Sequence, residues 1–241
     1  MAMKHPLAIA LIAGLALGAT ACTEPVTPLV STSPPSAATA LPSQTEPSPA
    51  PTTDVLSAYK AVLLNKANFA STDDGNAPMT LDEFFARHSG NSGTAMTASQ
   101  FTVIDLDHDG TPELVLQLAT TADEYYGFEI LHYEAGTVYG YNFVYRALTD
   151  LKADGTFSYA NSADDNGIGA IQFAGATYQL DKITYCQPPN GYGNGAAISY
   201  VVNHEIATEE AFLDAENAQT AKPGVIWHDF TPANIETQLP G

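Results

Sequence analysis

Residues 101–118 read FTVIDLDHDGTPELVLQL, two short apolar runs separated by an acidic segment that contains one glycine. Short runs rich in β-branched and large apolar side chains are typical of strands. A turn around Asp109 and Gly110 is too short for the crossover that parallel strands need, so it connects antiparallel neighbours. The stretch therefore predicts a β-hairpin with strands at residues 101–104 and 114–118.

The same alternation of strand-like runs and short turns continues along the chain. Further strands are predicted at residues 128–133, 138–144, 157–159, 168–173, 178–185 and 197–202. Turn pairs lie between them at Ala135-Gly136, Asp154-Gly155, Asn166-Gly167, Ala174-Gly175 and Asn190-Gly191. These turns indicate an antiparallel meander.

Helical patterns flank the predicted meander. Apolar residues recur at helical spacing after Asp54, and Thr80 with Glu83 forms a capping-box pattern before a second helix. Thr208 precedes two glutamates, which favour the start of a third helix. The expected fold class is α+β, an antiparallel meander sheet with flanking helices.

Aromatic residues alternate along one predicted strand. Tyr139, Tyr141, Phe143 and Tyr145 share one face at strand spacing. We expect this aromatic face to be covered by helices, because large rings contribute strongly to core packing. The alternative is an exposed row of rings that stacks on sugars or anchors a peptide.

The first residues form an export signal. Lys4 precedes an apolar run at residues 7–17, which is too short to span a bilayer. The run ends in Ala19-Thr20-Ala21-Cys22, which resembles the lipobox of bacterial lipoproteins, although Leu is more usual at the position of Ala19. The resemblance implies cleavage after residue 21, acylation of Cys22 and anchoring in the lipid bilayer. Simple secretion is the alternative, since Ala19 and Ala21 also fit an ordinary signal-peptidase site.

Residues 22–53 have the composition of a tether. They contain eight prolines among Ser, Thr and Ala, a composition that cannot bury enough apolar surface to fold. A polyproline-like segment of this length reaches on the order of 90 Å. We expect a signal peptide at residues 1–21, a disordered tether at 22–53 and a single α+β domain at 54–241.

Composition excludes some partners. The net charge of −19 repels phosphate backbones, so nucleic acid is not an expected partner. Two cysteines cannot build a disulfide scaffold or a multi-cysteine zinc site. With Cys22 acylated, Cys186 would be a buried small hydrophobe; in a freely secreted protein the two could pair.

The turn of the first hairpin carries the pattern of a cation site. Asp105, Asp107, Asp109 and Glu113 occupy positions one, three, five and nine of the segment, with Gly110 at position six. Four neighbouring carboxylates repel one another unless a cation neutralises them. Ca²⁺ accepts about six to eight oxygens, and the Thr111 carbonyl and water would complete its shell. The alternative is a solvated acidic turn without an ion.

These residues resemble the D-x-D-x-D-G-x-x-[DE] calcium loops of integrin-type FG-GAP and VCBS repeats. The resemblance covers about nine residues in a single copy, which is too little for a propeller. It is not an EF-hand, because Leu116 stands at the position of the bidentate glutamate and strands flank the loop. Residues 104–116 with Asp154-Gly155 also resemble uncharacterised surface lipoproteins of Gram-positive bacteria, which supports a cell-surface location.

No catalytic residue is assigned from the sequence. The histidines lack the H-E-x-x-H spacing of zinc proteases, since Thr208 stands where the second histidine would follow His204-Glu205. We expect a monomeric, membrane-anchored binding or adhesion protein on the extracytoplasmic face, with a structural Ca²⁺ and an unidentified protein or carbohydrate ligand. The alternatives are an exported hydrolase that uses two carboxylates, such as a glycoside hydrolase, and a purely structural envelope protein.

Overall fold

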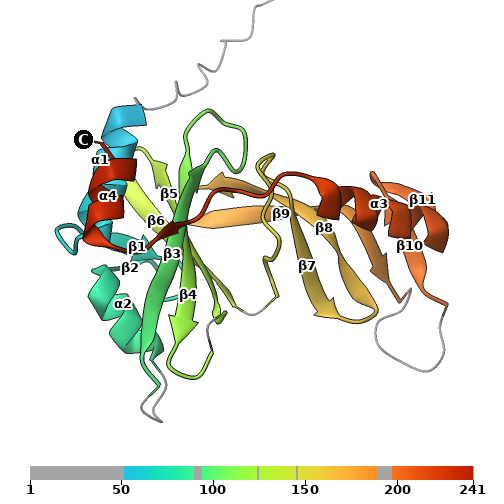
Figure 1. Ribbon diagram of the computed structural model, residues 1–241, viewed down its shortest axis with the longest axis horizontal. Helices are drawn as coiled ribbons and strands as arrows, with labels where there is room; N and C mark the ends of the chain where they lie inside the picture. The colour runs from blue at the N-terminus through green and yellow to red at the C-terminus, as the bar shows by residue number, and fades with distance from the viewer. Residues whose placement is uncertain (1–51, 90–93, 124, 145, 189–196, 241) are drawn as a thin grey trace, which may run out of the picture. The chain divides into compact units, whose positions relative to one another are not determined.

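The computed structural model of the protein describes residues 52–89, 94–123, 125–144, 146–188 and 197–240. The described residues form an α+β fold, as the sequence predicts (Figure 1). Its helices are α1 (Thr52–Leu63), α2 (Leu81–His88), α3 (Glu209–Ala221) and α4 (Pro232–Gln238). Its strands are β1 (Phe69–Ser71), β2 (Ala77–Met79), β3 (Met96–Ile104), β4 (Glu113–Thr120), β5 (Gly127–Glu134), β6 (Thr137–Val144), β7 (Phe157–Ser162), β8 (Asp165–Ala174), β9 (Thr177–Gln187), β10 (Ser199–Val202), β11 (Glu205–Ala207) and β12 (His228–Asp229).

The first sheet has seven strands in the order β12-β3-β4-β5-β6-β1-β2. Strands β3 to β6 form the predicted antiparallel meander, and only β1 runs parallel to its neighbour β6. Ala135 and Gly136 adopt positive φ in the tight β5–β6 turn, as their turn pattern predicts. The last registered pair of β3 and β4 is Ile104 with Glu113, so the acidic segment forms the loop between them.

Both faces of this sheet are buried. Leu114, Leu116 and Leu131 pack in a core with residues of α1, α2 and α4, which lie on one side of the sheet (Figure 1). Val115 and Ile130 point to the opposite face and pack in a second core with residues of the other sheet. Burial on both faces explains the almost continuous apolar sequence of β4.

The remaining strands form a second sheet in the order β11-β10-β9-β8-β7. A single meander would require β7 to pair with β6. The free edge of β6 is instead occupied by β1, through the pairs Ala70–Tyr139 and Ser71–Gly140. Strand β7 pairs with β8 and not with β6, so the predicted strands divide between two sheets.

The expected turn at Asn166-Gly167 is wrong. Both residues lie within β8, and the chain reverses just before Asp165. Gly167 serves close backbone approach instead, because a Cβ at this position would lie 2.0 Å from the Thr184 carbonyl oxygen. The Asn190-Gly191 turn lies outside the described residues.

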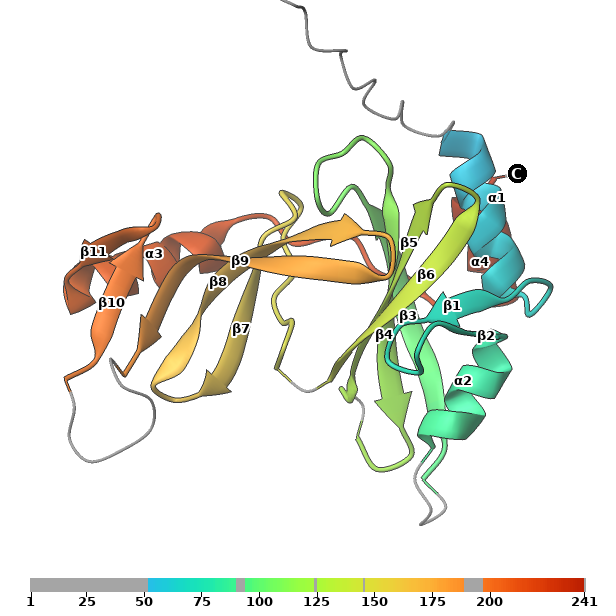
Figure 2. The same cartoon turned by 180° about the vertical axis from the view of Figure 1, so that it is seen from behind.

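The aromatic face of β6 is covered by the second sheet and not by helices as expected. Tyr141 contacts Phe173, with ring centroids 4.9 Å apart, and Phe143 contacts Tyr178 at 5.0 Å. The β8–β9 hairpin, which carries Phe173 and Tyr178, approaches β6 in Figure 2. Tyr145 lies outside the described residues. The alternation of the rings correctly predicted that they share one face of the strand. Which element covers that face depends on the two-sheet arrangement.

The helix starts predicted at Thr80 and Thr208 are confirmed, whereas α1 begins at Thr52, so that Asp54 lies in its first turn. Thr80 and Glu83 form a complete capping box at α2, and the Thr208 hydroxyl accepts a hydrogen bond from the Ala211 amide at the start of α3. Helix α4 was not predicted as a helix, although Thr231 caps it and Pro232 occupies its first turn.

Strand β5 carries a fully buried ionisable side chain. Glu129 lies on β5 and has no exposed surface. Its Oε2 accepts a hydrogen bond from Asn142 Nδ2 at 3.2 Å, while Oε1 has no partner within the described part of the chain. Burial raises the pKa of Glu129 well above its ordinary value, and the charges of Asp73 and Asp74 add to this effect. Burial therefore favours the protonated form of this carboxyl in the folded protein.

The protonated Glu129 makes stability depend on pH. The folded state keeps a proton that the unfolded chain releases above its ordinary pKa, so the stabilisation is present at low pH and is lost as pH rises. Relative to the wild type, Glu129→Gln should gain free energy of unfolding as the pH rises from 4 to 8, because glutamine has no proton to lose. Urea denaturation at both pH values measures this, with Glu210→Gln on exposed α3 as control. A difference that does not change with pH would contradict the assignment.

Candidate metal centre

The acidic loop closes the β3–β4 hairpin and has a tightly curled backbone. His108 and Gly110 adopt positive φ angles of 62° and 90°. Glycine tolerates this conformation without strain, and single residues of other types adopt it in tight turns. The curl turns the side chains of the three aspartates towards a common centre.

The structure brings Asp105, Asp107 and Asp109 together. One carboxylate oxygen of each lies within 4.8 Å of the others, a separation compatible with a shared metal ion. Backbone amides hold the carboxylates in place: Gly110 N donates to Asp105 Oδ2 at 3.2 Å, and Thr111 N donates to Asp109 Oδ1 at 2.6 Å. Asp109 N donates to Asp107 Oδ1 at 3.2 Å.

The aspartate cluster carries negative charge that its surroundings only partly compensate. Asp105 Oδ1 is buried and has no hydrogen-bond partner among the described residues. Burial raises the pKa of Asp107, and the neighbouring charge of Asp109 raises it further. A cation at the centre would offset both the repulsion and the missing hydrogen bond.

Thr111 and Glu113, the other predicted ligands, occupy different places. Thr111 is buried at the end of the loop. Glu113 is fully buried, and both of its oxygens have partners: Leu106 N donates to Oε2 at 2.7 Å, and His132 Nδ1 lies 2.9 Å from Oε1. Glu113 therefore falls into a second group, with Asp107 and His132, and not into the group of three aspartates.

Glu113 and His132 form a buried, coupled pair. Burial raises the pKa of the Glu113 carboxyl to about 7, although the hydrogen bonds from His132 and Leu106 oppose this shift. Burial alone would lower the pKa of His132, but the hydrogen bond and charge of Glu113 raise it. The pair supports the loop from the sheet side.

His132 was not predicted as part of the site. It lies on β5, one position beyond Leu131, which pairs with Leu114 on β4. This register puts His132 opposite Glu113, and only the pairing of β4 with β5 reveals it. The sequence did offer one signal: His132 is two residues from Ile130, so both side chains lie on the same buried face of β5.

The loop also contacts the second sheet and α1. Asp107 Oδ2 accepts a hydrogen bond from Phe173 N at 3.2 Å, and the Asp107 carbonyl accepts one from Gln172 Nε2 at 2.8 Å. The His132 ring stacks on Phe173, with centroids 4.9 Å apart. From α1, the Tyr59 hydroxyl donates to the Pro112 carbonyl at 3.0 Å. The loop thus joins three parts of the fold.

The predicted lipidation site cannot be placed in the same way. Cys22, the signal peptide and most of the tether lie outside the described residues. Among the described helices, none has the length and apolar character needed to span a bilayer. Cys186 is free and buried, which agrees with its predicted role as a small hydrophobe.

Comparison with known proteins gives no relative: no family model matches the chain, and neither a curated protein nor a solved structure is significantly similar to it.

Proposed function

We propose that the loop at residues 105–113 binds Ca²⁺ and that the ion fixes the β3–β4 hairpin against the second sheet, within a membrane-anchored extracytoplasmic binding protein. The observation that carries this proposal is the convergence of one carboxylate oxygen each from Asp105, Asp107 and Asp109, together with a buried oxygen of Asp105 that lacks a partner in the described structure. The same Asp107 accepts the Phe173 amide, so an ion bound there would act on the contact between the sheets.

The chemistry of the donors favours Ca²⁺ over other ions. The three aspartates and the Thr111 carbonyl offer only oxygen, which suits hard cations, and Ca²⁺ tolerates the irregular geometry of a loop. Mg²⁺ demands a near-octahedral shell and retains its waters. Zn²⁺ prefers nitrogen and sulfur, and the nearby His132 nitrogen Nδ1 is already paired with Glu113.

Glu113 has a supporting role in this proposal. For it to act as the ninth-position ligand that the sequence predicts, one of its oxygens would have to leave Leu106 N or His132. Either loss would leave a buried polar group unpaired, at a cost of about 1–3 kcal/mol. The arrangement therefore favours Glu113 as the residue that holds the loop while the aspartates face the ion.

Calcium binding predicts a shift in thermal stability. A Kd of about 10⁻⁴–10⁻³ M would be sufficient outside the cell, so about 10 mM Ca²⁺ should raise the unfolding temperature of the purified full chain by several degrees relative to EDTA. Asp105→Asn should abolish the shift, because it removes charge at the buried oxygen without changing the shape. Asp214→Asn on exposed α3 is the matched control and should keep it.

Two results would count against the calcium proposal. An equal shift with Mg²⁺ would remove the preference for Ca²⁺. The absence of any shift in the wild type would leave residues 105–113 as an acidic turn held by its own hydrogen bonds.

Membrane anchoring is the second part of the proposal. It is supported by the apolar run at residues 7–17, by Cys22 at the expected cleavage point and by the proline-rich segment that follows. A tether of this composition would hold the folded residues clear of the membrane surface. The strong negative charge is compatible with a place outside the cytoplasm, away from nucleic acid.

Metabolic labelling tests the anchor. In a bacterial host, the wild-type chain should incorporate labelled palmitate and fractionate with membranes. Cys22→Ala should lose both properties, because the thiol that accepts the lipid is gone. Cys186→Ala, which removes the other cysteine, should retain both; label in Cys22→Ala would refute acylation at this residue.

A binding role is favoured over hydrolysis. The carboxyl groups whose pKa is raised most clearly by burial, Glu113 and Glu129, have no exposed surface. A glycosidic bond could not reach either of them, whereas a general acid must touch its substrate.

A further inference from the structure

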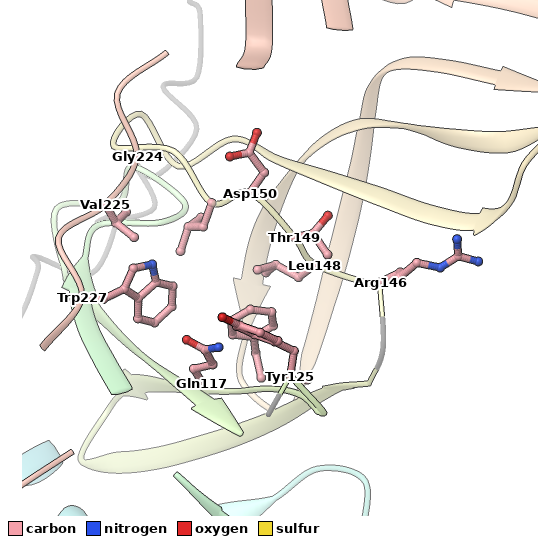
Figure 3. Close-up of a pocket in the computed structure, with 12 residues that line it drawn as sticks. Gln117, Tyr125, Arg146, Leu148, Thr149, Asp150, Gly224, Val225 and Trp227 are labelled. Atoms are coloured by element: carbon pink, nitrogen blue, oxygen red, sulfur yellow. The ribbon is translucent and has the colours of Figure 1, made fainter. Parts of the chain in front are cut away.

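A cavity of about 480 Å³ opens on the face of the first sheet that carries the second core (Figure 3). It lies between β4, β5 and two segments at residues 146–151 and 224–227, and contains no residue of the acidic loop. Its apolar walls are formed by Phe128, Leu148, Leu151, Val225 and Trp227. A cavity of this size and character is typical of small-molecule sites.

A polar side chain reaches into this mainly apolar cavity. The side chain of Gln117 points into the cavity in Figure 3, and the residue is only 8% exposed. Its backbone carbonyl accepts a hydrogen bond from Ser99, but its side-chain amide makes none with the described residues. A ligand that carries a hydrogen-bonding group would pair with this amide inside the cavity.

The charged residues of the cavity wall do not face its interior. The Asp150 carboxylate and the Arg146 guanidinium point away from the centre in Figure 3. Asp150 is also paired with Lys152 at 2.8 Å. A charged ligand would therefore lose its hydration without gaining an opposite charge.

Flat surfaces line the cavity. The rings of Trp227 and Phe128 lie 5.9 Å apart at an angle of 30°, so the wall offers broad apolar faces. Such faces bind planar rings by dispersion and by exclusion of water.

We infer that this cavity binds an uncharged, planar, mainly apolar molecule of one or two rings, which carries a hydrogen-bonding group for Gln117. A sugar needs several polar partners around its ring, whereas the walls of this cavity are mainly apolar. An alkyl chain would leave that amide unpaired. The inference rests on the proposed binding role but involves none of the metal loop.

The sequence supplies a reporter for this site, because Trp227 is the only tryptophan of the chain. Full-chain protein labelled with fluorotryptophan should give a single fluorine NMR signal. Titration with 2-naphthol should shift that signal saturably. Naphthalene, which lacks the hydroxyl, should bind about tenfold more weakly, and methyl glucoside should not bind.

Matched variants locate the binding. Val225→Phe fills the cavity and should abolish the 2-naphthol shift. Ile226→Phe adds the same group at a neighbouring residue that is 76% exposed and does not line the cavity, so it should retain binding. Gln117→Met keeps the side-chain length and should remove the preference for 2-naphthol over naphthalene.

Several outcomes would overturn the inference: no saturable shift with 2-naphthol, equal binding of naphthalene by the wild type, tighter binding of methyl glucoside, or unchanged binding by Val225→Phe. The same samples should be heated with Ca²⁺ and with EDTA. If Ca²⁺ does not raise the unfolding temperature of the wild type but 2-naphthol binds, only the metal proposal is refuted. If Ca²⁺ raises the unfolding temperature but 2-naphthol does not bind, only the cavity inference is refuted.

Discussion

Asp107 brings a negative charge into the contact between the two sheets, and much of the structure around it compensates for that charge. The residue is only 6% exposed, and it faces Asp105 and Asp109 while its Oδ2 accepts the Phe173 amide. Burying a carboxylate is unfavourable unless hydrogen bonds or an opposite charge offset the lost hydration. The amides supply part of this compensation, and a bound cation would supply the rest.

One face of the first sheet links the metal loop to the cavity. Glu113, Val115 and Gln117 alternate along β4 and therefore share a face, as do their neighbours His132, Ile130 and Phe128 on β5. Glu113 and His132 support the loop at one end, and Gln117 and Phe128 line the cavity about 14 Å further along. Val115 and Ile130 pack between them in the second core. The shared strands give both sites a rigid base.

The parts of the fold that were predicted from sequence are encoded locally. Thr80 with Glu83 specifies a helix start, and the acidic loop with its flanking apolar runs specifies the β3–β4 hairpin. The division into two sheets depends instead on β1, three residues long, which pairs with the edge of β6. Likewise, His132 joins the site through strand register, and the cavity is assembled from separate segments. Such contacts between distant residues leave no periodic pattern in a single sequence.

The most direct test of the central claim is amide hydrogen exchange at Phe173, followed by NMR on the full chain with Ca²⁺ and with EDTA. Its N–H donates to Asp107 across the contact between the sheets. If the ion fixes this contact, Ca²⁺ should slow the exchange of Phe173 by roughly tenfold or more, together with the amides of Gly110 and Thr111 in the loop. Unchanged exchange at Phe173 in the presence of Ca²⁺ would contradict the account, even if the loop itself became protected.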